Sequence, residues 1–178
     1  MIQSKSDYRE YVLSDKAALF ISKKRPGLLD HVWKYERLLR LTEYYHNVRS
    51  DLIGRVLYYV LRILLDHAGN KLGFDIPINC CGKGLSLAHR DVIINEKASI
   101  GENCRIYSGV VIGSKGSGGG GSPTLGNNVF VGTGAKLLGD ITIADNVKIG
   151  ANSVVIESIH EAGTVWAGIP AKRIIGRK

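Results

Sequence analysis

The sequence has few cysteines, few aromatic residues and no long apolar run. Its 178 residues include three cysteines, Cys80, Cys81 and Cys104, whose spacing fits neither a metal site nor a disulfide framework. We therefore expect a reducing, cytoplasmic compartment. The longest apolar stretch, VLYYVLRILL, is short and contains Arg62, which argues against a membrane span. No signal peptide is visible. Tryptophan occurs twice, methionine once and glycine 22 times. This balance favours many short strands and tight corners.

The charge is basic, with 24 lysines and arginines against 16 acidic residues, a formal net charge of +8. Such a balance can indicate nucleic acid, a membrane surface or a phosphate-bearing ligand. The basic residues are spread along the chain, and in the repeats no aromatic residues interleave with them, so we do not expect nucleic-acid binding.

Residues 1–72 have the apolar spacing of helices. Three segments show it: SDYREYVLSDKAALFISKK, then LLDHVWKYERLLRLTEYYHNV after Pro26-Gly27, and then SDLIGRVLYYVLRILLDHAG. In the third segment Ser50 or Asp51 is a candidate N-cap, and Gly69 is a candidate stop. The apolar faces are short, so we expect them to cap the second half of the chain or a neighbouring subunit.

Residues 73–178 follow a repeat of six. Aliphatic residues recur at Ile94, Ile100, Ile106 and Ile112, and they resume at Leu125, Val131, Leu137, Ile143, Ile149 and Val155. A parallel β-helix explains this period, because each hexad supplies one short strand and one corner, and three hexads close a triangular coil. We predict a mainly β fold, a parallel β-helix with an N-terminal α-helical segment.

Two irregularities interrupt the repeat. Thirteen residues separate Ile112 from Leu125, so we expect an extruded loop over 113–124, either a tolerated surface insertion or a flap over a ligand groove. Seven residues separate Leu87 from Ile94, which predicts a bulge that displays His89. A histidine there could act as a general base, or it could be a surface side chain in a turn. The spacing alone does not separate these readings.

These features together resemble the hexapeptide-repeat acyltransferases, and the segments AGIPAK and VGTGAKLLGDITIADNVKIGANSVV carry the resemblance. The branch it resembles most is serine acetyltransferase and its relatives encoded with bacterial polysaccharide genes. The resemblance implies a trimeric, left-handed β-helix that binds acetyl-CoA between two subunits. It implies His89 as the base, with Asp75 as a weaker candidate to orient it, and backbone N–H groups near Gly113 as the oxyanion site.

For coenzyme A the resemblance points to Thr133, Gly134 and Ala151 beside the pantetheine arm and to Pro170 beside the adenine. Lys148, Lys172 and Arg173 could contact the phosphates, or they could be ordinary solvated charges. A metal site is not expected, because only His89 and His160 lie in the repeats.

The acceptor is less clear than the donor. Serine acetyltransferases carry an aspartate directly before the catalytic histidine and an Arg-His pair near the end of the loop. Ala88, Gly121 and Ser122 occupy these places here. A zwitterion needs charged partners, so we expect acetyl transfer to a hydroxyl of a sugar or polysaccharide precursor, which could bring the protein close to a membrane. The alternatives are serine O-acetylation and a non-catalytic β-helix scaffold. The acceptor itself, the role of the helices and the choice between trimer and hexamer are not determined.

Overall fold

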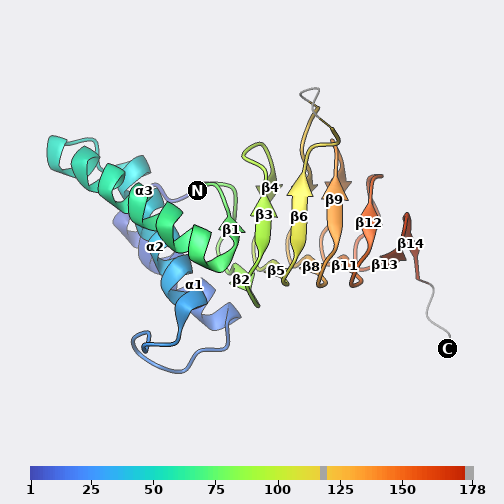
Figure 1. Cartoon of the computed structure of the whole chain (residues 1–178), viewed down its shortest axis with the longest axis horizontal. Coiled ribbons are helices and arrows are strands. Elements are labelled where there is room, and N and C mark those ends of the chain that lie inside the picture. The colour runs from blue at the N-terminus through green and yellow to red at the C-terminus, as the bar shows by residue number, and fades with distance from the viewer. Residues whose placement is uncertain (117–119, 175–178) are drawn as a thin grey trace.

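The computed structural model describes residues 1–116 and 120–174. Within this part the chain begins with three helices, and fourteen short strands follow. Figure 1 shows the helices packed at one end of an elongated stack of strands, with the last strand, β14 (Ala171–Arg173), at the other end. The predicted division at residues 72 and 73 falls between the last helix and the first strand.

Two of the three helices begin at a residue whose side chain caps the backbone. Helix α1 (Lys5–Ala18) is capped by Ser4, whose hydroxyl accepts the N–H of Asp7, and α2 (His31–Val48) begins after Asp30. Helix α3 (Leu52–Leu72) is capped by Asp51, one of the two predicted N-caps. The predicted stop at Gly69 is wrong. The helix continues to Leu72 and ends at Gly73, which adopts the left-handed conformation that favours glycine.

Gly69 has a packing role instead. It is buried inside α3, and a Cβ atom placed there would lie 2.6 Å from the carbonyl oxygen of Phe74. The glycine therefore allows the helix to approach the first strand closely. In the sequence, such a glycine looks the same as one that ends a helix.

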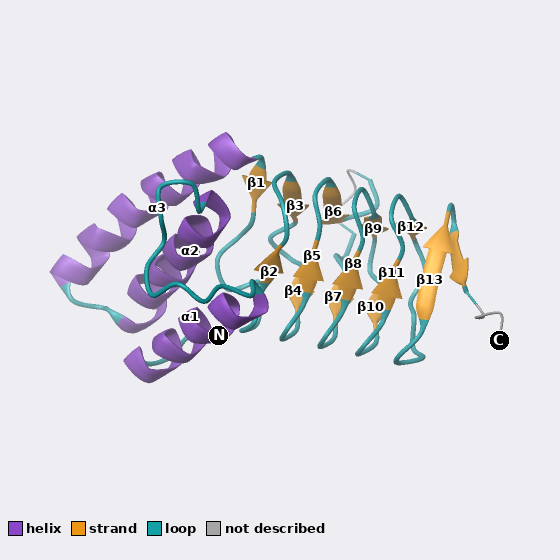
Figure 2. Cartoon of the chain, turned by 90° about the horizontal axis from the view of Figure 1, so that it is seen from below, coloured by secondary structure: helices purple, strands orange, loops and turns teal. Residues whose placement is uncertain are grey.

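The strands form three sheets that run along the three sides of a prism, and Figure 2 shows the coils stacked one after another. Sheet A contains β1 (Phe74–Asp75), β3 (Val92–Ile94), β6 (Val110–Gly113), β9 (Lys136–Leu138) and β12 (Val154–Val155). Sheet B contains β4 (Ser99–Ile100), β7 (Thr124–Leu125) and β10 (Thr142–Ile143). Sheet C contains β2 (Ser86–Leu87), β5 (Arg105–Ile106), β8 (Phe130–Val131), β11 (Lys148–Ile149), β13 (Val165–Gly168) and β14 (Ala171–Arg173).

The predicted hexad repeat is confirmed by the register. Val92 pairs with Val110 one coil later, a step of eighteen residues, and every pairing except β13 with β14 is parallel. The repeated aliphatic side chains point inward: Ile106, Ile112 and Ile143 have no exposed surface. Asparagines with positive φ turn four of the corners, at Asn103, Asn128, Asn146 and Asn152.

Both predicted irregularities also correspond to the register. Ile100 pairs with Leu125, which is seven residues more than one regular coil, so an insertion lies between β6 and β7. Part of the predicted loop, residues 117–119, lies outside the described residues, as do residues 175–178 of the predicted second domain. Leu87 pairs with Ile106 over nineteen residues, whereas Ile94 pairs with Ile112 over eighteen. The first coil therefore holds one extra residue between Leu87 and Val92.

The helices pack on the first coil of the same chain. This is one of the two expected arrangements; the other was a contact with a neighbouring subunit. Tyr35 and Leu39 of α2 and Leu65 and Leu72 of α3 belong to the same buried cluster as the aliphatic core of the strands. The ring of Tyr35 lies 4.7 Å from that of Phe74. Over the residues that the structure describes, no helix has the length and apolar character needed to cross a bilayer.

Candidate active site

One long edge of the prism gathers several of the predicted site residues. The turns that follow β2, β5, β8 and β11 stack along this edge, between sheets C and A. Their backbones are joined from coil to coil: the N–H of Gly134 donates to the carbonyl of Ser108 at 2.8 Å, and the N–H of Asn152 donates to that of Thr133 at 2.8 Å. His89, Thr133, Gly134 and Ala151 therefore lie on one edge.

His89 is presented by the extra residue in the first of these turns. Its side chain is exposed, and the neighbouring Asp91 takes a positive φ of 63° to complete the bulged turn. The imidazole lies 5.9 Å from the ring of Tyr107, edge to face, and Tyr107 lies 5.2 Å from Phe130. An aromatic row thus extends from His89 along the outer surface beside the edge.

Glu36 supports the strand that carries His89. Its carboxyl group is fully buried, and Oε1 accepts the N–H of Leu87 at 2.9 Å. Burial raises the pKa of Glu36 well above its ordinary value. Helix α2 is therefore bonded directly to the last strand residue before the histidine turn.

His89 lines a cleft of about 530 Å³ between this turn, the end of α1 and the start of α2. One wall is apolar and includes Leu19, Ile21, Leu29 and the buried Trp33. The polar lining residues are Asp30, His31, His89, Arg90, Asp91 and Ser108. The indole N–H of Trp33 has no hydrogen-bond partner in the described part of the chain. The cleft thus combines an imidazole with groups of both charges.

Asp30, one of the two acids that line this cleft, was not among the residues predicted from the sequence. Its carboxylate accepts the N–H of Gly27 at 2.6 Å and approaches the ammonium of Lys23 at 3.3 Å. The bond from Gly27, and then that from Lys23, lower the pKa of Asp30, so the group is ionised at neutral pH. The turn Pro26-Gly27 was a usable signal for the start of α2, but nothing local places that helix beside a turn about sixty residues later.

Asp75 and Gly113 lie in a different cleft. It measures about 670 Å³ and runs along sheet A below α3, where Tyr58, Arg62 and Asn95 also line it. Asp75 pairs with Ile93 on the flat face of the sheet, whereas His89 lies on the edge. A single chain therefore does not bring the candidate orienting acid or the candidate oxyanion site to the imidazole.

The predicted phosphate contacts lie on sheet C and at its last hairpin. Lys148 is exposed on β11, and Lys172 on β14 pairs with Ala167, just beyond the last turn of the edge. Arg173 forms an ion pair with Glu161 at 2.7 Å, so part of its charge is already compensated. Pro170 lies in the turn between β13 and β14. Among the described residues, no group of histidine, cysteine and acidic side chains could hold a metal ion.

The chain is similar to known transferases. The family model described as "Bacterial transferase hexapeptide (six repeats)" matches residues 122–157. A serine acetyltransferase of Helicobacter pylori is 39% identical over 140 residues, which cover 76% of each chain. A serine acetyltransferase of Synechococcus elongatus is 39% identical over 140 residues, 76% of this chain but only 53% of that protein.

The fold agrees with these matches. The structure of a Brucella abortus serine acetyltransferase in complex with coenzyme A superimposes with a TM-score of 0.72 at 26% identity, covering 96% of this chain and 68% of that one. These relatives do not support the polysaccharide-linked branch expected from the sequence, and they point to serine acetyltransferases instead. On the identity and coverage of the Helicobacter relative, the chain belongs to the serine acetyltransferase family of hexapeptide-repeat transferases.

Proposed function

We propose that the protein is an acetyl-CoA-dependent O-acetyltransferase whose acceptor is L-serine. The observation that carries the proposal is the cleft in which His89 lies beside groups of both charges. Relatives named serine acetyltransferases, one of them solved with coenzyme A, support the same donor and acceptor.

Charged partners for a zwitterion can come from the cleft. In the sequence, the uncharged residues Ala88, Gly121 and Ser122 occupy the places of the charged groups of serine acetyltransferases. In the folded chain Arg90 can pair with the serine carboxylate, and Asp30 can pair with the ammonium group, because both line the cleft that contains His89. The partners come from the turn itself and from the start of α2.

His89 would act as the general base. Its imidazole takes the proton of the acceptor hydroxyl while the oxygen attacks the thioester carbonyl of acetyl-CoA. The tetrahedral intermediate collapses, the carbon–sulfur bond breaks, and the imidazolium returns the proton to the coenzyme A thiolate. Holding both substrates together lowers the entropic part of the barrier, and no acyl-enzyme is needed.

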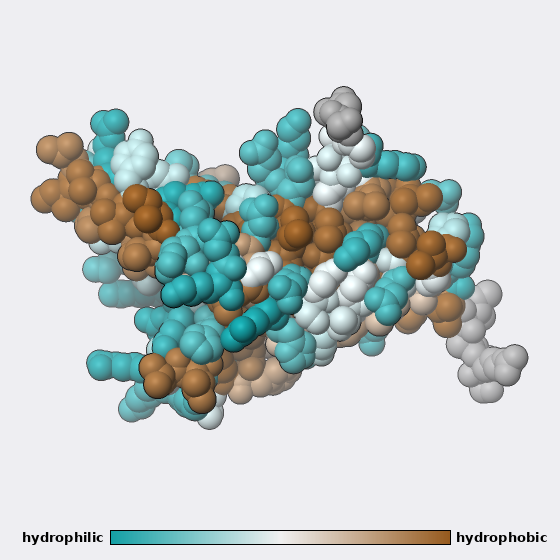
Figure 3. Space-filling view, viewed as in Figure 1, coloured by the Kyte–Doolittle hydropathy of each residue, from teal (hydrophilic) through white to brown (hydrophobic). Residues whose placement is uncertain are grey.

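We propose further that the β-helix is left-handed and that three copies assemble through sheet A. Its outer face carries Ile93, which is 47% exposed, together with the half-buried Val111 and Leu138. Figure 3 shows hydrophobic surface across this sheet and along α3. An apolar face of this kind fits a protein–protein contact.

Such an assembly would complete the site. The edge of one copy, with His89, Thr133 and Ala151, would face the cleft of its neighbour that contains Asp75 and Gly113. Acetyl-CoA would lie between them, with Gly134 along the pantetheine arm. Lys148, Pro170, Lys172 and Arg173 stay proposed contacts of the adenine and the phosphates.

A sugar hydroxyl is a second candidate acceptor, favoured by one observation. The cleft of about 530 Å³ lies in the range of roughly 300–1,000 Å³ that is typical of sites for larger small molecules. Trp33 is among the residues that line the cleft, and aromatic side chains favour contact with a sugar ring.

Coenzyme A release, followed with a thiol reagent, tests both candidates. We expect turnover with millimolar L-serine, a loss of about 10²–10⁴-fold in His89→Ala, and a wild-type rate in His160→Ala, the other histidine of the repeats. Turnover with a panel of sugars but not with serine would move the assignment to the second candidate. An unchanged rate in His89→Ala would show that His89 is not the general base. A thermal shift with acetyl-CoA separates both candidates from a scaffold that binds no cofactor.

A further inference from the structure

A separate cavity lies on the outer face of sheet C, beneath the C-terminal end of α1. Its volume is about 410 Å³, and its lining shares no residue with the His89 cleft. Ser86 and Arg105 form its floor on β2 and β5, while Ser14 and Phe20 cover it from α1 and the segment that follows. Asn103 lies beside Arg105 in the turn before β5.

Two buried polar atoms of this floor lack partners. Ser86 is 3% exposed, and neither its Oγ nor the Nε of Arg105 has a hydrogen-bond partner among the described residues. Ser86 and Arg105 pair directly across β2 and β5, so their side chains lie next to each other on the same face of the sheet. An unpaired buried donor is costly, so two adjacent ones indicate a bound acceptor.

The charge of the cavity is positive. Arg105 is the one charged residue in its described lining, and over residues 1–116 and 120–174 no ion pair joins it to an acid. Its guanidinium lies 4.9 Å above the ring of Phe20 and 5.9 Å from the ring of Tyr107. Aromatic rings against the guanidinium restrict its orientation, and a planar guanidinium pairs well with a carboxylate.

The rest of the cavity is apolar. Ala17, Ala18 and the ring of Phe20 line the side opposite the floor. A free inorganic ion would use only the polar side, whereas an anion with a short carbon chain would contact both.

We propose that this cavity binds the carboxylate of a small organic acid. The guanidinium of Arg105 pairs with the carboxylate, the Ser86 hydroxyl donates to the same group, and the carbon chain lies against Ala18 and Phe20. The proposal does not depend on acetyl transfer, because no residue of the cavity belongs to the proposed active site.

A titration with sodium butyrate tests the site. Chemical shifts of the backbone amides of Gly84, Ser86 and Arg105 are followed by TROSY spectra, with sodium chloride at equal ionic strength as the reference. We expect saturable shifts with a millimolar dissociation constant. Arg105→Gln should weaken binding at least tenfold, and Ser86→Ala severalfold. Lys97→Gln, which removes an exposed positive charge outside the cavity, should leave binding unchanged.

Three results would overturn the proposal. Shifts that grow linearly without saturation would show that no site exists, and equal affinity in Arg105→Gln would show that the guanidinium is not the anchor. Saturable binding of potassium phosphate without binding of butyrate would refute the organic carboxylate. If Arg105→Gln does not fold, as judged by circular dichroism, Ser86→Ala and Phe20→Ala carry the test. Phe20 is 78% exposed, so its replacement is tolerated.

Discussion

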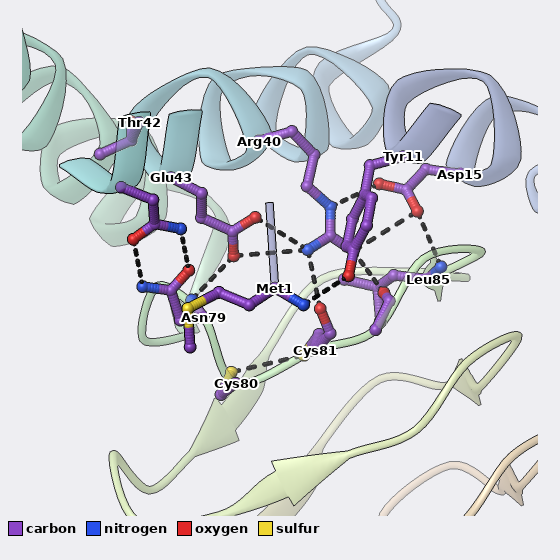
Figure 4. A network of polar contacts seen from close by, with 12 residues as sticks. Met1, Tyr11, Asp15, Arg40, Thr42, Glu43, Asn79, Cys80, Cys81 and Leu85 are labelled. Atoms are coloured by element: carbon purple, nitrogen blue, oxygen red, sulfur yellow. Dashed lines mark hydrogen bonds and ion pairs between the residues drawn. The ribbon is translucent and has the colours of Figure 1, made fainter. Parts of the chain in front are cut away.

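Replacing Arg40 should show how strongly the helices are attached to the first coil. Its side chain has no exposed surface, and its guanidinium donates to four partners (Figure 4). Nε lies 2.7 Å from Oδ2 of Asp15, and Nη1 lies 3.0 Å from Oε2 of Glu43. Nη1 also donates to the carbonyl of Cys81 at 2.9 Å, and Nη2 to that of Gly82 at 2.6 Å. One side chain thus links α1 and α2 to the strand region.

The expected loss follows from what Arg40→Met leaves behind. Methionine keeps much of the apolar stem, but two buried carboxylates lose their counter-ion and two carbonyls lose the guanidinium as a donor. Asp15 then keeps the N–H of Leu85, and Glu43 keeps that of Asn79. Removing one partner of a buried ion pair costs about 3–5 kcal/mol, because the remaining charge is uncompensated. The matched control is Arg49→Met, whose pair with Asp51 is exposed by 40% and 46%. An exposed pair contributes about 0–1 kcal/mol.

Urea unfolding, followed by circular dichroism at one fixed protein concentration, measures both variants. We expect the loss for Arg40→Met to exceed that for Arg49→Met by at least about 2 kcal/mol. Losses that agree within about 0.5 kcal/mol would refute the view that the buried cluster is the main attachment of the helices.

Three further variants test other parts of the fold. Burial raises the pKa of Glu36 well above 4.5, so between that pH and the folded pKa the folded chain holds a proton that the unfolded chain releases, and the free energy of unfolding falls as pH rises above 4.5. Glu36→Gln does not titrate, so its free energy of unfolding should rise relative to wild type by up to about 1.4 kcal/mol per pH unit; a difference that does not change with pH would contradict this. Gly84→Ala should lower the melting temperature more than Gly163→Ala. Both glycines have a positive φ, 75° and 72°, but a new Cβ at Gly84 would clash with Oδ1 of Asn103, whereas no described atom lies within 4 Å of one at Gly163; equal losses would show that the clash does not matter. If the proposed trimer forms through sheet A, Ile93→Lys should lower the mass measured by light scattering, and an unchanged mass would exclude sheet A as the contact.

The strand region was predictable because its information is local and repeated. Each hexad places one aliphatic side chain inside the prism, so Ile106, Leu125 and Ile143 could be assigned to the core from spacing alone. The insertion after Ile112 and the extra residue before Val92 were visible as breaks in the same spacing. The end of α3 was not predictable, because two glycines near it have different roles. Gly69 is needed for close packing against Phe74, whereas Gly73 adopts the left-handed conformation that ends the helix.

The candidate site was predictable only in part, because only some of its residues lie in the repeat. The stacked coils place His89, Thr133 and Ala151 on one edge, and the family resemblance had already pointed to these residues. The position of Asp30 beside His89 depends on how α2 packs against the first coil, and no sequence period reports that packing.

The sequence by itself determined the period, the inward face and the places where the coil is interrupted, because a stacked coil repeats one local interaction many times. Only the tertiary structure decided which charged residues line the cleft with His89 and which candidates stay apart in one chain. That arrangement is set by the docking of helices on strands, through single contacts such as Arg40 with Gly82 and Glu36 with Leu87, which occur once and leave no pattern in the sequence.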